Sequence, residues 1–297
     1  MKKAVVTGAL GFIGSNLVDQ LVKRGHSVLG VDNLSCGFEE YKNPGAEYEI
    51  ENAQDFERYG DFDWVFHLAA WPRIQPSFDD PIGHDDVNVR VTLQILDKLK
   101  GLKNKPKLLF TSSSSVYGNT EVLPTAETAA VDPLSPYALQ KYTSEKYIEM
   151  IGDRFDIPWV SLRFFNAYGP RSYNPGNKWN AYSSVVGIFM RQAMDGKPLT
   201  VTGDGKQRRD FVHVLDIADA LITTAEKGQG LYNVGTGSAL SILDLANEFQ
   251  KQFNTDIVHI AERKGEALET LADVTKISSL GWKPSWTVER AIREKAV

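Results

Sequence analysis

The sequence has a single cysteine, Cys36, among its 297 residues. No disulfide can form within the chain, which is typical of proteins in a reducing cytoplasm. Long apolar runs are also lacking. No window of about 18 residues is apolar and free of charge, so no transmembrane helix is expected. The apolar run at the N-terminus reaches Gly8 too soon for a signal peptide. We therefore expect a cytoplasmic protein with no membrane partner.

A large excess of either charge is lacking as well. The formal net charge is -5, from 33 basic and 38 acidic residues. This balance gives no electrostatic reason to expect binding to nucleic acid or to an anionic membrane. Basic residues do recur late in the chain, around Arg208, Arg209 and Arg263. They suit a small anionic ligand better than a polymer, and solvated surface charge is the alternative. No metal site is expected.

The composition, with 42% apolar and 24% charged residues, is that of a globular protein. In the first half, apolar strand-like runs at 3–7, 27–31, 64–68, 107–111 and 159–164 alternate with helical patterns at 12–24, 85–99 and 135–151. This alternation predicts an α/β fold with a Rossmann doubly wound parallel sheet. The strands are apolar throughout, as expected for a sheet covered on both faces. We interpret residues 1–165 as this first domain.

The regular alternation of strand-like and helical segments ends after Phe165. Loops rich in Gly, Pro and Asn separate helical patterns near 183–194, 215–226 and 241–252. We interpret residues 166–297 as a smaller C-terminal α/β domain that binds the substrate. Segments near 208–235 are expected to return to the first domain.

A glycine-rich turn, with Gly8, Gly11 and Gly14, follows the first strand and opens the first helix. Glycine lets the backbone turn sharply and approach a diphosphate, and the helix N-terminus attracts the negative charge. The spacing departs from G-x-G-x-x-G, so a turn without a ligand is the alternative. Asp32 ends the second strand and suits the ribose hydroxyls of a dinucleotide. No Arg or Lys occurs at 33–37 to hold a 2′-phosphate, which favours NAD over NADP.

Tyr137 and Lys141 are spaced i, i+4 on a predicted helix and share one face. An ammonium group near the phenol would lower its pKa from about 10 and make it a general base toward a substrate hydroxyl. Tyr142 and Lys146 repeat the spacing, but about 140° around the axis. We choose Tyr137 because it follows Pro136 in the first turn, at the end where doubly wound sheets bind ligands.

A run of hydroxyl side chains from Thr111 to Ser115 follows the strand at 107–111. Hydroxyls at the carboxyl end of a strand can share a proton with Tyr137 and with a substrate hydroxyl. A serine-rich loop without a catalytic role is the alternative.

These motifs together resemble the extended short-chain dehydrogenase/reductase family, and within it the NAD-dependent nucleotide-sugar epimerases, most of all the UDP-glucose 4-epimerases. The resemblance covers nearly the whole chain. It rests on these segments in order: Thr7 to Gly14, Asp32 to Ser35, His67 to Ala70, Asn88-Val89, Ser113 to Gly118, Ser135 to Lys141, Leu162 to Arg171, Arg209 to Val214, Asn233 to Gly235, and Leu280 to Pro284.

The resemblance implies reversible oxidation at C4 of a UDP-hexose through a transient 4-keto intermediate, with UDP-glucose and UDP-galactose as substrates. It makes Ser113, Tyr137 and Lys141 catalytic and suggests a homodimer, paired through the helices near 85–99 and 135–151. The implied NAD contacts are Gly8, Gly11, Phe12, Ile13, Gly14, Asp32, Asn33, Ser35, Glu51, Asn52, Leu68, Ala69, Ala70, Asn88, Ser112, Tyr137, Lys141, Phe164 and Phe165. The implied substrate contacts are Ser113, Ser114, Tyr137, Asn166, Arg209, Arg263, Glu266 and Thr270.

Three departures from the family pattern matter. Glu51-Asn52 stands where Asp-Ile or Asp-Val often faces the adenine. Trp71-Pro72-Arg73 is unusual and should lie near the substrate. Thr270 replaces a bulky residue of some 4-epimerases, so a small side chain there could leave room for an N-acetyl group at C2 of the sugar.

Other reactions of the same superfamily stay open. A dehydratase or decarboxylase usually carries an acid beside the catalytic serine or threonine, where this chain has Ser114 and Ser115. A reductase would consume reduced cofactor stoichiometrically. A protein that senses NAD without chemistry often lacks the tyrosine or the lysine, and both are present here.

Overall fold

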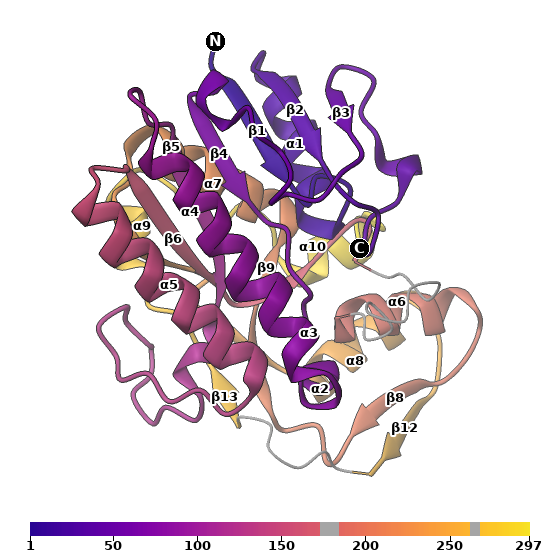
Figure 1. Cartoon of the computed structure of the whole chain (residues 1–297). Coiled ribbons are helices and arrows are strands. Elements are labelled where there is room, and N and C mark those ends of the chain that lie inside the picture. The colour runs from indigo at the N-terminus through magenta and orange to yellow at the C-terminus, as the bar shows by residue number, and fades with distance from the viewer. Residues whose placement is uncertain (173–183, 262–267) are drawn as a thin grey trace.

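The computed structural model describes residues 1–172, 184–261 and 268–297. Its centre is a sheet of seven parallel strands in the order β10-β6-β5-β4-β1-β2-β3 (Figure 1). The strands are β1 (Lys3–Thr7), β2 (Ser27–Val31), β3 (Glu47–Glu49), β4 (Trp64–His67), β5 (Lys107–Ser113), β6 (Trp159–Phe164) and β10 (Gly230–Val234). The strand order reverses direction between β1 and β4, which is the arrangement of a doubly wound fold.

Helices cover both faces of this sheet. On one face α1 (Phe12–Lys23) lies against α7 (Val214–Lys227), and on the other α4 (Val91–Lys100) lies against α5 (Pro136–Arg154). Side chains alternate between the two layers along each strand: Val6 packs in the α1/α7 core and Val5 in the α4 core. Both faces are therefore apolar, and the predicted Rossmann-type α/β fold is confirmed.

Helix boundaries follow local signals. Ser135 caps α5 by accepting a hydrogen bond from the backbone N–H of Ala138, and Pro136 occupies the first turn. The single helix expected over 85–99 is instead α3 (Pro81–Asp85), a π-helical turn (Asp86–Arg90) and α4. Asp80 caps α3, which starts this run earlier than the apolar pattern alone indicates. The short helix α2 (Ile74–Asp79) precedes it.

The rest of the chain builds a second lobe beside the carboxyl ends of the strands. β7 (Asn166–Tyr168), β9 (Arg208–His213), β11 (Ala239–Ser241) and β13 (Glu269–Thr270) form one small sheet, and β8 (Leu199–Thr202) pairs with β12 (Ile257–Ile260). The helices α6 (Val185–Met194), α8 (Ile242–Phe253) and α10 (Val288–Arg293) pack around a separate apolar core. The short helix α9 (Thr275–Ser278) packs beside β10.

The segment near 208–235 divides between the two sheets. Helix α7 and strand β10 belong with the seven-stranded sheet, where β10 pairs with β6, whereas β9 lies in the smaller sheet beside β7. Within the described residues no helix has the length and apolarity needed to cross a membrane.

Candidate active site

A cavity of about 1340 Å³ lies at the carboxyl ends of the parallel strands and extends to the second lobe. Cavities for one drug-sized ligand measure about 300–1,000 Å³, so this one has room for a dinucleotide and a second ligand. Most of the residues singled out in the sequence line it: Gly8, Gly11, Phe12, Ile13, Gly14, Asp32, Asn33, Ser35, Glu51, Asn52, Leu68, Ala69, Ala70, Ser112, Ser113, Ser114, Tyr137, Lys141, Phe164, Phe165, Asn166, Arg209 and Thr270.

The glycine-rich turn is packed too tightly for larger residues. Gly8 has a φ of +70°, and a Cβ on Gly14 would lie 2.0 Å from the Gly8 carbonyl oxygen. These two glycines close the turn against the first helix. Gly11 differs: a Cβ there would meet only the Gly8 oxygen, at 3.3 Å. No side chain among the described residues caps α1 at Gly11. The open side of Gly11 and the free N–H groups of α1 therefore fit a diphosphate.

Asp32 is buried just after β2. Its two carboxylate oxygens accept hydrogen bonds from the backbone N–H groups of Leu10, at 2.9 Å, and Leu34, at 2.8 Å. Burial raises the pKa of Asp32, and these two hydrogen bonds lower it. The carboxylate keeps further acceptor capacity for ribose hydroxyls. Nearby, Asn33 donates to the Asn52 side chain at 2.9 Å, so the two segments expected around the adenosine meet.

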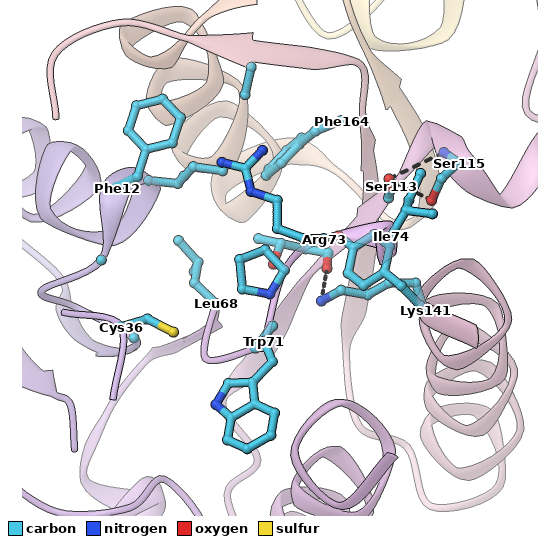
Figure 2. Close-up of a pocket in the computed structure, with 18 of the residues that line it drawn as sticks. Phe12, Cys36, Leu68, Trp71, Arg73, Ile74, Ser113, Ser115, Lys141 and Phe164 are labelled. Atoms are coloured by element: carbon cyan, nitrogen blue, oxygen red, sulfur yellow. Dashed lines mark hydrogen bonds between the residues drawn. The ribbon is translucent and has the colours of Figure 1, made fainter. Parts of the chain in front are cut away.

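Lys141 lies one turn after Tyr137 on α5 and is buried. Its Nζ donates to the carbonyl oxygen of Thr111 at 2.9 Å and lies 4.8 Å from the centroid of the Phe110 ring (Figure 2). Burial lowers the pKa of Lys141 to about 7, although the carboxylate of Glu145 raises it. The end of β5 thus fixes the ammonium group at the cavity wall.

The pKa of the Tyr137 phenol is raised, whereas a lowered pKa was expected. Burial raises its pKa above 10, while a hydrogen bond from Ser113 and the positive charge of Arg73 lower it. Lys141 was expected to supply that charge. Its ammonium group is instead held by the Thr111 carbonyl, and the helical spacing alone could not reveal this. The positive charge that lowers the pKa of the phenol belongs to Arg73, which lies in none of the family motifs.

Two hydrogen bonds from Ser115 hold the hydroxyl of Ser113. Its Oγ accepts a hydrogen bond from the Ser115 hydroxyl at 2.9 Å and one from the Ser115 backbone N–H at 3.2 Å (Figure 2). A serine hydroxyl has one hydrogen to donate and two acceptor lone pairs. With both acceptor positions used, that hydrogen can be donated to Tyr137, whose pKa Ser113 lowers. Ser115 was not among the expected site residues, although it stands in the same hydroxyl run.

Asn88 does not line the cavity, in contrast to its expected nicotinamide contact. It lies behind the wall, accepts a hydrogen bond from the backbone N–H of Trp71 at 2.9 Å and donates to the Trp71 carbonyl at 3.1 Å. A third hydrogen bond joins it to the side chain of Gln140. Asn88 therefore fixes the loop after β4, and its contact with the nicotinamide nucleotide stays a prediction.

The second lobe contributes Asn166, Arg209 and Thr270. Asn166 donates to the Thr270 hydroxyl and to the Asp210 carbonyl, both at 3.1 Å. Asp210 is fully buried and accepts from the backbone N–H groups of Thr236, Gly237 and Ala272, which ties β9 to the segments on either side. Arg263 and Glu266 lie outside the described residues.

The alternative pair, Tyr142 and Lys146, faces elsewhere. Tyr142 packs in a small apolar cluster with Val116 and Tyr117, and Lys146 pairs with Glu149 at the surface. Neither lines the cavity. The rotation of about 140° between the two pairs accounts for this separation.

Comparison with known proteins identifies the family of this chain. A family model described as the NAD dependent epimerase/dehydratase family matches residues 4–235. The chain belongs to this family. A putative UDP-glucose 4-epimerase of Methanocaldococcus jannaschii is 33% identical over 297 residues, covering 97% of this chain and 95% of its own.

Solved structures show the same fold over the whole chain. The UDP-N-acetylglucosamine 4-epimerase of Methanobrevibacter ruminantium M1, in complex with UDP-N-acetylmuramic acid, is 33% identical with a TM-score of 0.92, covering 99% of this chain and 97% of its own. The UDP-glucose 4-epimerase of Thermus thermophilus, in complex with NAD, is 31% identical with a TM-score of 0.88, covering 98% and 96%. The cofactor of this epimerase/dehydratase chain is NAD.

Trp71 and Arg73, expected near the substrate, line the cavity, and so do several residues that no motif indicated. The loop after β4 brings Trp71, Arg73 and Ile74 into it, and Cys36 lies near Asp32. From the second lobe, Ile188 and Gln207 join them. The departure of Trp71-Pro72-Arg73 from the family pattern was the only signal that pointed to any of these residues.

Proposed function

We propose that this protein is a UDP-hexose 4-epimerase that interconverts UDP-glucose and UDP-galactose through a transient 4-keto intermediate. The observation that carries the proposal is that the Ser113 hydroxyl, which lowers the pKa of Tyr137, and the Tyr137 phenol line the same cavity as the glycine-rich turn. In the proposed complex a sugar beside the nicotinamide would lie within reach of this proton acceptor.

The proposed roles follow the positions of the residues. Gly11 and the N-terminus of α1 receive the NAD diphosphate, and Asp32 receives the adenosine ribose. Lys141 receives the nicotinamide ribose. From the second lobe, Asn166 and Arg209 hold the diphosphate of the nucleotide sugar, for which the planar guanidinium fork of arginine is suited.

In the proposed reaction Tyr137 removes the proton of the sugar 4-hydroxyl while the Ser113 hydroxyl donates to the phenolate oxygen. Bound NAD would supply the acceptor for the C4 hydride and would return that hydride to the opposite face of the ring. The residues at the nucleotide end stay in place, so the 4-keto sugar can turn between the two steps. Tyr137 then gives its proton back to the new 4-hydroxyl, and no net oxidation results.

A dehydratase, decarboxylase or net reductase of the same family is the second candidate. Dehydration needs an acid beside the reacting carbons to protonate the leaving hydroxyl. In the described residues the acids that line the cavity are Asp32, Glu51 and Asp86, and none of them belongs to the segment that carries Ser113. Ser114 and Ser115 there favour epimerisation.

The N-acetyl sugars are proposed as further substrates. Thr270 is small, and its hydroxyl is held by Asn166 at 3.1 Å rather than projecting freely. The proposal for N-acetyl sugars fails if the enzyme turns over UDP-glucose but shows no activity on UDP-N-acetylglucosamine.

A homodimer is proposed from the apolar surface of the helices. Helix α5 exposes Leu139, Tyr147 and Met150, and α3 exposes Ile82, which is 76% exposed. Large apolar side chains gathered on one face mark an association surface. The molar mass in solution, measured by light scattering on a size-exclusion column, tests this assignment.

The reaction is tested by incubating the purified protein with UDP-glucose, UDP-galactose and their N-acetyl forms, without added cofactor, and separating the products. We expect interconversion at C4 with no accumulation of reduced cofactor. Tyr137→Phe should lower kcat by at least about 100-fold, the typical contribution of a general base. Tyr142→Phe is the matched control and should stay near wild type. Retained activity in Tyr137→Phe together with its loss in Tyr142→Phe would overturn the assignment.

A further inference from the structure

Arg73 reaches into the cofactor side of the cavity from a loop that no recognised motif includes. It follows β4 and precedes α2, and it lines the same cavity as the glycine-rich turn. Figure 2 shows its side chain running from the Ile74 side of the cavity, with the guanidinium group between Phe12 and Phe164. Arg73 lines the same cavity as Phe12, the first residue of α1, whose N-terminus fits a diphosphate.

The backbone at Arg73 is strained. Its φ is 106° and its ψ is 138°, a conformation that glycine tolerates and that other residues rarely adopt. Such strain costs about 1–3 kcal/mol and persists only where the surroundings enforce it, commonly at ligand sites. Here hydrogen bonds hold the loop on both sides of Arg73. The side chain of Asn88 makes two hydrogen bonds to the Trp71 backbone, and the Ser77 hydroxyl donates to the Ile74 carbonyl at 2.6 Å.

The electrostatic surroundings favour an anion. Burial lowers the pKa of Arg73, and the nearby Tyr137 and Cys36 raise it. Arginine nevertheless stays protonated, because its ordinary pKa is above 12. A charge that has lost much of its hydration is stabilised by an opposite charge, and the planar guanidinium matches two phosphate oxygens at once.

We propose that Arg73 binds a diphosphate in this cavity, and that the diphosphate is that of the dinucleotide. The interaction of Arg73 with Cys36, which lies near Asp32, supports the dinucleotide, because the anchors proposed for the nucleotide sugar, Asn166 and Arg209, come from β7 and β9 of the second lobe. The inference rests on the proposed function only in that NAD occupies the cavity.

The test compares ligand affinities of the full-length protein stripped of dinucleotide. NAD, ADP-ribose, adenosine and UDP are titrated by calorimetry into wild type, Arg73→Met and Arg73→Lys. Arg154→Met, at the surface, is the matched control. We expect Arg73→Met to weaken NAD and ADP-ribose by about 10- to 100-fold, as for a charge-assisted hydrogen bond. Adenosine and UDP should stay within about 2-fold, and Arg73→Lys should fall between.

A fourth variant separates binding from folding. Arg73→Gly removes the guanidinium and also relieves the backbone strain, so its cofactor-free form should unfold at an equal or higher urea midpoint while NAD binds more weakly. If Arg73 had a merely structural role, the Arg73→Gly variant would instead unfold at a lower urea midpoint than wild type.

The possible results of the titrations test different parts of the proposal. Loss of UDP affinity alone assigns the diphosphate to the nucleotide sugar and overturns the dinucleotide part of the proposal. Unchanged affinities in Arg73→Met overturn it entirely, while the proposed function stands. If wild type itself binds neither NAD nor ADP-ribose, the proposed function fails first.

Discussion

Replacing Ser115 with alanine removes the hydroxyl that donates to Ser113 at 2.9 Å. The Ser113 hydroxyl is then less firmly directed to Tyr137, and the hydrogen bond that lowers the pKa of the phenol weakens. The pKa of Tyr137 should therefore rise. A general base acts in its deprotonated form, so kcat at neutral pH should fall.

The size of the effect follows from one neutral hydrogen bond. Its net contribution is about 1 kcal/mol. One pKa unit corresponds to about 1.36 kcal/mol, so the pKa should rise by about 0.7. Below the pKa, the phenolate fraction and with it kcat then fall about 5-fold. This is an upper bound, because the backbone N–H of Ser115, 3.2 Å from the Ser113 Oγ, stays in place.

The assay is the dependence of kcat on pH, from about 6 to 10, with sugar interconversion followed by a coupled enzyme. Ser115→Ala should lose activity by up to about 5-fold throughout this range, because the pKa of the phenol lies above it. Ser115→Thr keeps a hydroxyl and should retain the wild-type profile. An unchanged kcat in Ser115→Ala, or an equal loss in Ser115→Thr, would refute the idea that Ser115 orients the Ser113 hydroxyl.

Two further predictions concern stability, measured by urea unfolding of the cofactor-free protein. Burial lowers the pKa of His67 to about 3, so below about pH 6.5 the unfolded chain binds a proton that the folded chain does not. Stability should fall toward pH 3 by up to about 1.4 kcal/mol per pH unit from this group, and His67→Gln should remove that part of the slope. Glu145→Gln leaves Arg163 as an uncompensated buried charge and should cost about 3–5 kcal/mol, whereas Glu149→Gln, in an exposed pair, should stay within about 0.5 kcal/mol of wild type. Equal slopes in His67→Gln and wild type, or equal losses in the two glutamate variants, would contradict these accounts.

The first sheet could be predicted because its signals are local. Each strand is a short apolar run, and the helix periods between the strands are regular. The predicted strand at 159–164 matches β6. The small sheet of β7, β9, β11 and β13 was not predicted, since its strands are two to six residues long and pair across large sequence separations. Partners so distant leave no periodic pattern in one sequence.

The sequence by itself determined which residues could meet at the cavity. The glycines after β1, Asp32 after β2 and the hydroxyl run on β5 must converge, because parallel strands end at the same edge of the sheet. The helical period likewise separated Tyr137 from Tyr142.

Only the tertiary structure decided what each group touches. Asn88 holds the backbone of Trp71, Lys141 donates to the Thr111 carbonyl, and Arg73 projects into the cavity from a strained backbone. These contacts depend on burial and on partners far away in the chain. Hydrogen bonding and desolvation act through space, so residue spacing along the chain carries no record of them.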